Sequence, residues 1–266
     1  FTNAKTQKEV ILDVWNNEAS SSADYGRITI ELTGGATLSP FLITVQSGTS
    51  GIQQQRIGTA LTTASLTDWQ HYAINFKNSG SNGFQAKLYV SGNLNDTNAY
   101  VGSLNELKSK NMMGRIGALL TAPSGTAGTS SASDYAGMGK LSASLDEFRF
   151  WKEARNANNI ARHYLGQVRG GTNTDINNTT LGVYYKFNEG ITQTSSVDNS
   201  VLDYSGRISN GSWTGYGSNS RSTGSAIVIA SASAAEYKDP IIYSYHDDVS
   251  TLKTNLLSTG SYHDGN

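Results

Sequence analysis

The feature that most constrains the fold of this chain is a two-residue alternation of apolar side chains within short runs. Tyr25–Leu32 and Phe41–Gln46 both follow it, with polar residues between the apolar ones. Because successive side chains of a β-strand point to opposite faces, each run predicts a strand with one buried face. Further runs of this kind, some of them weaker, are Val10–Val14, Trp69–Phe76, Ala86–Val90, Met113–Leu120 and Leu181–Phe187.

The composition favours an all-β protein with many turns. The chain has 28 glycines among 266 residues, and Ser, Thr, Asn and Gly fill the segments between the apolar runs. Charged residues make up 15% of the chain, against roughly 25% in ordinary globular proteins. Because the strands are irregularly spaced and not separated by regular helices, we predict an antiparallel β-sandwich of jelly-roll type.

Charge and cysteine content exclude several classes of protein. A net charge of −1 provides no basic face for phosphates, so we expect no nucleic-acid partner. The absence of cysteine rules out disulfides, thiolate metal sites and a cysteine nucleophile. No run approaches the roughly 18 apolar residues of a membrane span, so no membrane insertion is expected. The first residue is Phe1 rather than Met, and we expect the chain to be a piece of a longer polypeptide.

Leu141–Trp151 reads as a strand with an irregularity. Its apolar residues change phase between Leu145 and Phe148, so either both faces are covered or a bulge near Asp146 and Glu147 shifts the register. The carboxylates of such a pair, placed within an apolar strand, need hydrogen bonds or ion pairs, for which nearby arginines are suited. The candidate arginines are Arg149 and Arg155.

One short amphipathic helix follows this strand. Asn156 is a suitable N-cap and Gly166 a suitable end, and we place Arg155 and Arg162 on the solvated side of the helix. The apolar residues recur at helical spacing, at Ala157, Ile160, Ala161, Tyr164 and Leu165.

The composition changes after about Gly224, which divides the chain into a sandwich domain, residues 1–224, and an extension, residues 225–266. In the extension, Pro240–Tyr243 reads as extended, and Asp247 or Asp248 could cap a second short helix. So small a segment cannot bury its own apolar face. We therefore expect residues 237–266 to dock on another protein or on a second copy of the chain.

Three phrases resemble a known family when they are read in order. They are Asp68–Ala73 (DWQHYA), Lys87–Gly92 (KLYVSG) and Leu145–Trp151 (LDEFRFW), the last followed by Ala154 and Arg155. In this order they resemble the laminin-G-like jelly rolls of the concanavalin A-like lectin/glucanase superfamily. The resemblance covers roughly Val10 to Tyr216 and implies a lectin-like β-sandwich.

Two later phrases have a narrower resemblance. Tyr184–Gly190 and Leu202–Gly211, with the extension from Asp239, resemble large structural proteins of tailed-phage virions. This implies a non-enzymatic structural or adsorption component of the phage tail, contacting other virion proteins or host-surface glycans. The alternatives are a secreted or surface bacterial adhesin that binds glycans and, third, a glycosidase.

The sequence disfavours glycoside hydrolysis. The glucanases of the superfamily carry carboxylates at alternate positions of one strand, as in E-x-D-x-(x)-E, which places them on one face. This chain has no such phrase, and in a regular strand Asp146 and Glu147 point to opposite faces. The resemblance does allow a Ca²⁺ ion at Asp146, because lectin-like domains hold Ca²⁺ through oxygen ligands. Asp203, before Ser205 and Gly206, reads as a turn residue rather than a metal ligand.

Glycan binding would require an exposed aromatic ring to stack on a pyranose. The candidates lie in or beside polar loops and are Trp15, Tyr135, Trp213 and Tyr216. For Trp213 and Tyr216 the alternative is packing beside a last edge strand. His71 lies on the polar phase of its strand, and we expect a buried, hydrogen-bonded role for it.

Overall fold

The computed structural model describes residues 9–19, 21–33, 38–62, 64–78, 83–100, 104, 111–120, 141–168, 179–189 and 199–214. The described strands are β1 (Glu9–Trp15), β2 (Gly26–Leu32), β3 (Phe41–Ser47), β4 (Ser50–Ile57), β5 (Tyr72–Asn78), β6 (Phe84–Val90), β7 (Asn93–Tyr100), β8 (Met113–Ile116), β9 (Phe148–Trp151), β10 (Leu181–Tyr185), β11 (Ser200–Val201) and β12 (Gly211–Ser212). The described helices are the 3-10 turn η1 (Ala64–Leu66) and the α-helix α1 (Ala157–His163).

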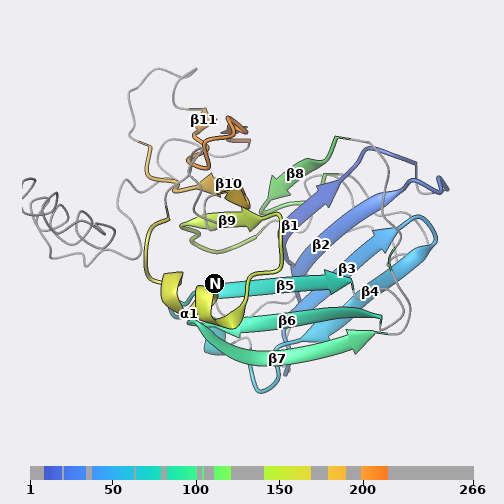
Figure 1. Cartoon of the computed structure of the whole chain (residues 1–266), viewed down its shortest axis with the longest axis horizontal. Helices are drawn as coiled ribbons and strands as arrows, with labels where there is room; N and C mark the ends of the chain where they lie inside the picture. The colour runs from blue at the N-terminus through green and yellow to red at the C-terminus, as the bar shows by residue number, and fades with distance from the viewer. Residues whose placement is uncertain are drawn as a thin grey trace, which may run out of the picture.

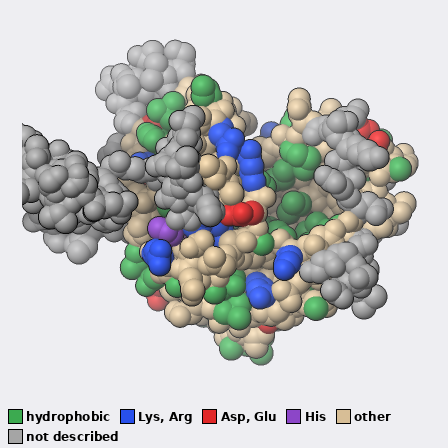
Figure 2. Space-filling view, viewed as in Figure 1, with side chains coloured by type: hydrophobic (Ala, Val, Ile, Leu, Met, Phe, Trp, Pro, Cys, Tyr) green, Lys and Arg blue, Asp and Glu red, His purple; other side chains and the backbone are tan. Residues whose placement is uncertain are grey.

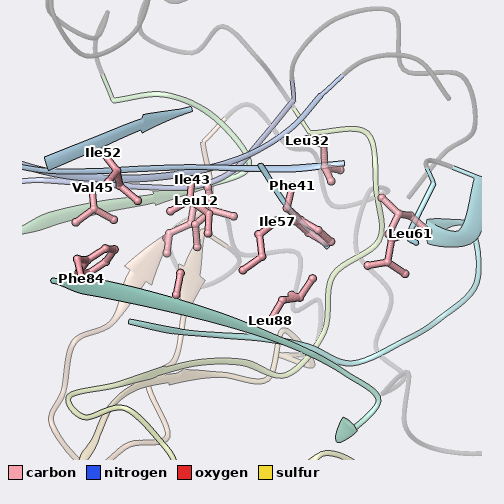
Figure 3. Close-up of a cluster of buried hydrophobic side chains, with 13 residues drawn as sticks. Leu12, Leu32, Phe41, Ile43, Val45, Ile52, Ile57, Leu61, Phe84 and Leu88 are labelled. Carbon is pink, nitrogen blue, oxygen red and sulfur yellow. The ribbon is translucent and has the colours of Figure 1, made fainter. Parts of the chain in front are cut away.

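Two antiparallel sheets pack face to face (Figure 1). One has five strands in the order β4-β3-β2-β1-β8, and the other has three in the order β5-β6-β7. The apolar residues that alternate along these strands fill the space between the sheets, and Phe41, Ile43, Ile57 and Leu88 are almost completely buried there (Figure 3). The predicted all-β sandwich is therefore confirmed.

Two long strands without a clear sequence signal, β4 and β7, are edge strands. β4 (SGIQQQRI) and β7 (NLNDTNAY) are largely polar, and each has a neighbour on one side only in its sheet. An edge strand that is half exposed does not need apolar alternation, so its sequence resembles a loop.

The strand expected over Leu141–Trp151 is shorter in the structure. Only Phe148–Trp151 is a strand, and Glu147 before it has a φ of +55°, a left-handed backbone conformation that ends regular pairing. The expected irregularity at Asp146 and Glu147 is therefore present, as a break before the strand.

The two sheets differ in width. Residues of β1 and β8, together with Leu141 and Phe148 outside both sheets, contribute partly buried apolar side chains to the main core. β9 and β10 form a separate pair, with a second small core of Val168, Leu181 and Tyr184 beside Trp151. Figure 2 shows a hollow on this face in which hydrophobic side chains are visible between the sheets.

The outer face of the five-stranded sheet carries a buried ion pair. Arg27 Nε donates to Asp13 Oδ1 at 2.8 Å and its Nη2 to Oδ2 at 2.5 Å, and both side chains are almost fully buried. Thr29 Oγ1 and the backbone N–H of Leu120 donate to the same carboxylate at 3.1 and 2.8 Å. Burial alone would lower the pKa of Arg27, but the hydrogen bond and charge of Asp13 raise it. The carboxylate thus joins β1, β2 and the segment after β8.

Asp13→Ala should destabilise the protein by about 3–5 kcal/mol, because it leaves the Arg27 guanidinium buried without its carboxylate. Urea unfolding followed by tryptophan fluorescence measures the loss. The double variant Asp13→Leu/Arg27→Met removes both charges and should lose clearly less stability than Asp13→Leu or Arg27→Met alone. If the loss in the double variant equals the sum of the two single losses, the pair is not coupled.

Candidate functional site

The phrase that first suggested a site, Leu145–Trp151, forms a structural cluster. Glu147 Oε2 accepts a hydrogen bond from Arg149 Nη2 at 2.9 Å and a short one from the Tyr184 hydroxyl. The prediction that an arginine would pair with this acidic segment is confirmed for Arg149 and Glu147. Burial in this cluster raises the pKa of Tyr184, and the charge of Glu147 adds to the effect while that of Arg149 opposes it.

Arg149 also binds the end of helix α1. Its Nη1 donates to the His163 carbonyl at 3.0 Å and its Nη2 to the Gly166 carbonyl at 2.6 Å. The last carbonyls of a helix lack partners within the helix, and a cation there also complements the helix dipole. At the other end, the Asn156 side chain accepts from the Asn159 N–H at 2.8 Å, as predicted for an N-cap.

Helix α1 packs against the sandwich through Tyr164. Gly92, with a φ of +80°, lies so close that an added Cβ would meet the Tyr164 ring at 2.8 Å. His71 lies beside the same ring, with the two ring centroids 6.0 Å apart. Burial, together with the nearby positive charge of Arg149, lowers the pKa of His71 to about 4. His71 is partly buried, and its Nδ1 has no hydrogen-bond partner among the described residues, so the expected hydrogen-bonded role is not found. The ring is neutral at pH 7.

Two expectations for the helix are wrong. Arg155 is not on the solvated side: it is 5% exposed, and its guanidinium lies 3.9 Å from the centroid of the Trp151 ring. An arginine before the helix can thus use its planar cation to cover an aromatic ring. Conversely, Leu165 is 63% exposed, because α1 ends at His163 and the helical spacing no longer applies after it.

Asp203 is a turn residue, as predicted. Its Oδ1 accepts the N–H groups of Tyr184 and Ser205, both at 2.9 Å, and its Oδ2 accepts the Ser205 hydroxyl at 2.7 Å and the Ser209 N–H at 2.9 Å. Burial alone would raise the pKa of Asp203, but these hydrogen bonds lower it. The bond from Tyr184 holds the loop after Val201 onto β10, and the other three fix the conformation of the loop itself.

The structure describes two of the predicted stacking residues, Trp15 and Trp213, and both contact the protein itself. Trp15 is partly buried at the end of β1, where its Nε1 donates to the Glu18 carbonyl at 3.1 Å. Trp213 follows the short strand β12 and packs on Phe187, with ring centroids 5.7 Å apart. Tyr135 and Tyr216 lie outside the described residues, as does the extension 225–266.

The described surroundings of Asp146 supply few of the oxygen ligands that a calcium ion needs. Its Oδ1 accepts the Glu147 N–H at 2.9 Å. Among the described residues, no three acidic or histidine side chains come together as a metal site. A Ca²⁺ ion prefers six to eight oxygen ligands, often carboxylates, so these residues fit it poorly. Calcium at Asp146 stays a prediction.

A groove of about 550 Å³ lies between the two edge strands β4 and β7, and we call it the β4–β7 groove. Its lining residues are Gln54, Gln55, Arg56, Asn98, Ala99 and Tyr100. Asn98 Nδ2 donates to the Arg56 carbonyl at 2.7 Å, which ties the two sheets together at this edge. Gln54 has a φ of +44°, and the pairing of β3 with β4 shifts register beside it, so β4 is bent here.

Two contacts hold the groove in place, one through Tyr100 and one through Asp96. The Tyr100 ring stacks on Phe84 in the core, with centroids 6.1 Å apart, and burial raises the pKa of its hydroxyl. At the end, Asp96 Oδ2 accepts the N–H groups of Gly58 and Thr59 at 2.8 and 3.1 Å. The groove thus offers amides and a guanidinium beside a tyrosine whose hydroxyl is buried.

Sequence reasoning missed this groove because its strands carry no alternating apolar pattern. The only available signal was the run of three glutamines in β4. It also missed Trp69, which is 60% exposed before β5 although its phrase was recognised as a fold signature.

The fold defines the class: an antiparallel sandwich of the lectin type, with a polar groove at its edge. The family model of the concanavalin A-like lectin/glucanases superfamily, in its laminin-G form, matches residues 2–161, and the chain belongs to this superfamily. No curated protein sequence matches the chain. None of the described helices has the length and apolar character of a membrane span.

A similar solved structure is that of a proposed carbohydrate-binding protein from Bacteroides ovatus. The two are 16% identical, the alignment covers 80% of this chain and 53% of that one, and the TM-score is 0.38. This chain thus spans about half the length of that protein.

Stability should fall as the pH is lowered from 6.5 towards 4. The folded protein keeps His71 neutral down to a pKa of about 4, whereas the unfolded chain binds a proton near pH 6.5. Over this window His71 should account for a loss of about 3 kcal/mol. His71→Phe, which keeps a ring of similar size, should flatten the slope of unfolding free energy against pH. An unchanged slope would show that His71 is accessible to protons when folded.

The calcium prediction has its own test. Ca²⁺ added to EDTA-treated protein should raise the thermal midpoint, and Asp146→Asn should abolish the rise while Asp68→Asn keeps it. If the midpoint does not move in the native protein, Asp146 is structural only.

Proposed function

We propose that this chain is a non-enzymatic glycan-binding module and that the β4–β7 groove is its binding site. The observation that carries the proposal is the convergence of side-chain amides and a guanidinium in a groove of about 550 Å³ at the edge of a lectin-type sandwich. Its volume lies within the range usual for small-ligand sites.

The groove chemistry suits sugar hydroxyls. An amide side chain both donates and accepts, so Gln54 and Gln55 can each bind neighbouring hydroxyls that act as donor and acceptor. The Arg56 guanidinium can donate to ring or hydroxyl oxygens, and Ala99 offers a small apolar surface for C–H groups.

The same lining supports a non-enzymatic role. Glycoside hydrolysis needs two carboxyl groups about 5–10 Å apart across the scissile bond. No Asp or Glu is among the residues that line the β4–β7 groove. Asp96, at its end, is already an acceptor for backbone N–H groups.

The proposed setting is a tailed-phage particle, in which the module would contact host-surface glycans. The resemblance of Tyr184–Gly190 and Leu202–Gly211 to virion structural proteins supports it. The alternative is a bacterial surface adhesin. A secretion signal or wall anchor in the full-length gene would favour the adhesin.

The test is a glycan array followed by calorimetry on the best ligand. Gln54→Ala and Gln55→Ala should each weaken binding by about 3- to 10-fold, the effect of losing one hydrogen bond. Gln53→Ala, in the same strand but outside the groove, is the matched control and should bind normally.

A flat array for the native protein would contradict glycan binding. Binding that survives both groove substitutions would place the site elsewhere. Release of reducing sugar from a bound glycan would contradict the non-enzymatic role.

A further inference from the structure

The phrase Val201–Arg207 holds an aromatic side chain in a fixed place beside β10. Asp203 makes the four hydrogen bonds described above, and the Tyr204 N–H donates to the Tyr184 carbonyl at 2.8 Å. The rings of Tyr184 and Tyr204 meet edge to face, with centroids 6.2 Å apart. Tyr204 nevertheless remains 37% exposed. Such rigid support exceeds what a simple surface turn requires.

Lys186 holds an ammonium group against this aromatic pair. Its Nζ lies 4.5 Å from the Tyr204 ring centroid and 5.5 Å from that of Tyr184. It donates one long hydrogen bond, of 3.3 Å, to Gln167 Oε1. An ammonium has three donors, and within the described part of the chain no carboxylate oxygen lies within ion-pair distance of this one. Two of its donors make no hydrogen bond with the described residues, and these are the donors we assign to a ligand.

The position of Lys186 is already set before any ligand binds. Contact with two aromatic rings attracts the ammonium and restricts a side chain that otherwise has many rotamers. A ligand anion would thus meet a pre-organised cation and would cause little loss of side-chain entropy.

Glu189 gives the site an acceptor. Its Oε1 accepts the Leu202 N–H at 2.9 Å, which leaves Oε2 for a hydroxyl group. Burial, with the charge of Glu189, raises the pKa of Tyr204, so the phenol keeps its proton beside this carboxylate.

We propose that Tyr204, Lys186, Gln167 and Glu189 form a second ligand site, distinct from the β4–β7 groove, for a pyranose that bears a carboxylate, such as a uronic acid. The sugar ring covers the exposed part of Tyr204, and its carboxylate binds Lys186 Nζ. Gln167 and Glu189 bind ring hydroxyls. The site lies beyond residues 2–161, the part matched by the family model.

The test compares trigalacturonic acid with its fully methyl-esterified form, which keeps the sugar but removes the charges. Calorimetry on the native protein should detect the acid and not the ester, and binding should weaken as salt is added. Lys186→Gln should weaken binding at least 10-fold, Lys186→Arg should retain most of it, and Tyr204→Ala should reduce it. Lys152→Gln, an exposed lysine after β9, is the matched control. Thermal midpoints of all variants check that they fold.

Equal affinity for acid and ester, unchanged binding by Lys186→Gln, or no binding of the acid would each overturn the proposal. Gln55→Ala separates it from the groove, since this variant should bind the acid normally. Loss of acid binding in Gln55→Ala with retention in Lys186→Gln would place the acid in the groove instead.

Discussion

The unequal width of the two sheets determines where β9, β10 and α1 pack against the sandwich. Three strands cannot cover the inner face of five, so apolar side chains of β1 and β8 need other partners. Phe148, at the start of β9, supplies part of this cover, and β9 brings β10 with it. The Arg149 guanidinium then joins β9 to the end of α1, and Tyr164 of that turn packs on Gly92 in the β6–β7 hairpin. β9, β10 and α1 are thereby attached to the sandwich at two places, through Phe148 on the main core and through Tyr164 on Gly92.

Much of the fold could be predicted from the sequence, because buried strands must alternate. The strands with a buried inner face, such as β2 and β3, were located to within a residue or two, and Asn156 was correctly identified as the N-cap. The arrangement of Arg149 and Arg155 was harder to predict. Sequence spacing does not show whether a cation meets water, a carboxylate or an aromatic ring, because that depends on contacts between segments far apart in the chain.

The candidate sites could not be located from sequence for a related reason. The β4–β7 groove lies between edge strands, where half-exposed polar residues give no periodic signal, and it forms only when the two sheets pack. Tyr204 and Lys186 are 18 residues apart and meet because Asp203 folds its loop back onto β10. The segment Val201–Arg207 is conspicuous in the sequence, but only these contacts indicate that it holds Tyr204 beside Lys186.

Three carboxylates of the described structure accept several hydrogen bonds from the protein itself. Asp13 accepts from two side chains and one backbone N–H, Glu147 from Arg149 and Tyr184, and Asp203 from three backbone N–H groups and a hydroxyl. The hydrogen bonds of Asp203 lower its pKa, which is the opposite of what a general acid in glycoside hydrolysis requires. In the two proposed sites, amides, an aromatic ring, cations and the second carboxylate oxygen of Glu189 therefore supply the contacts to a sugar.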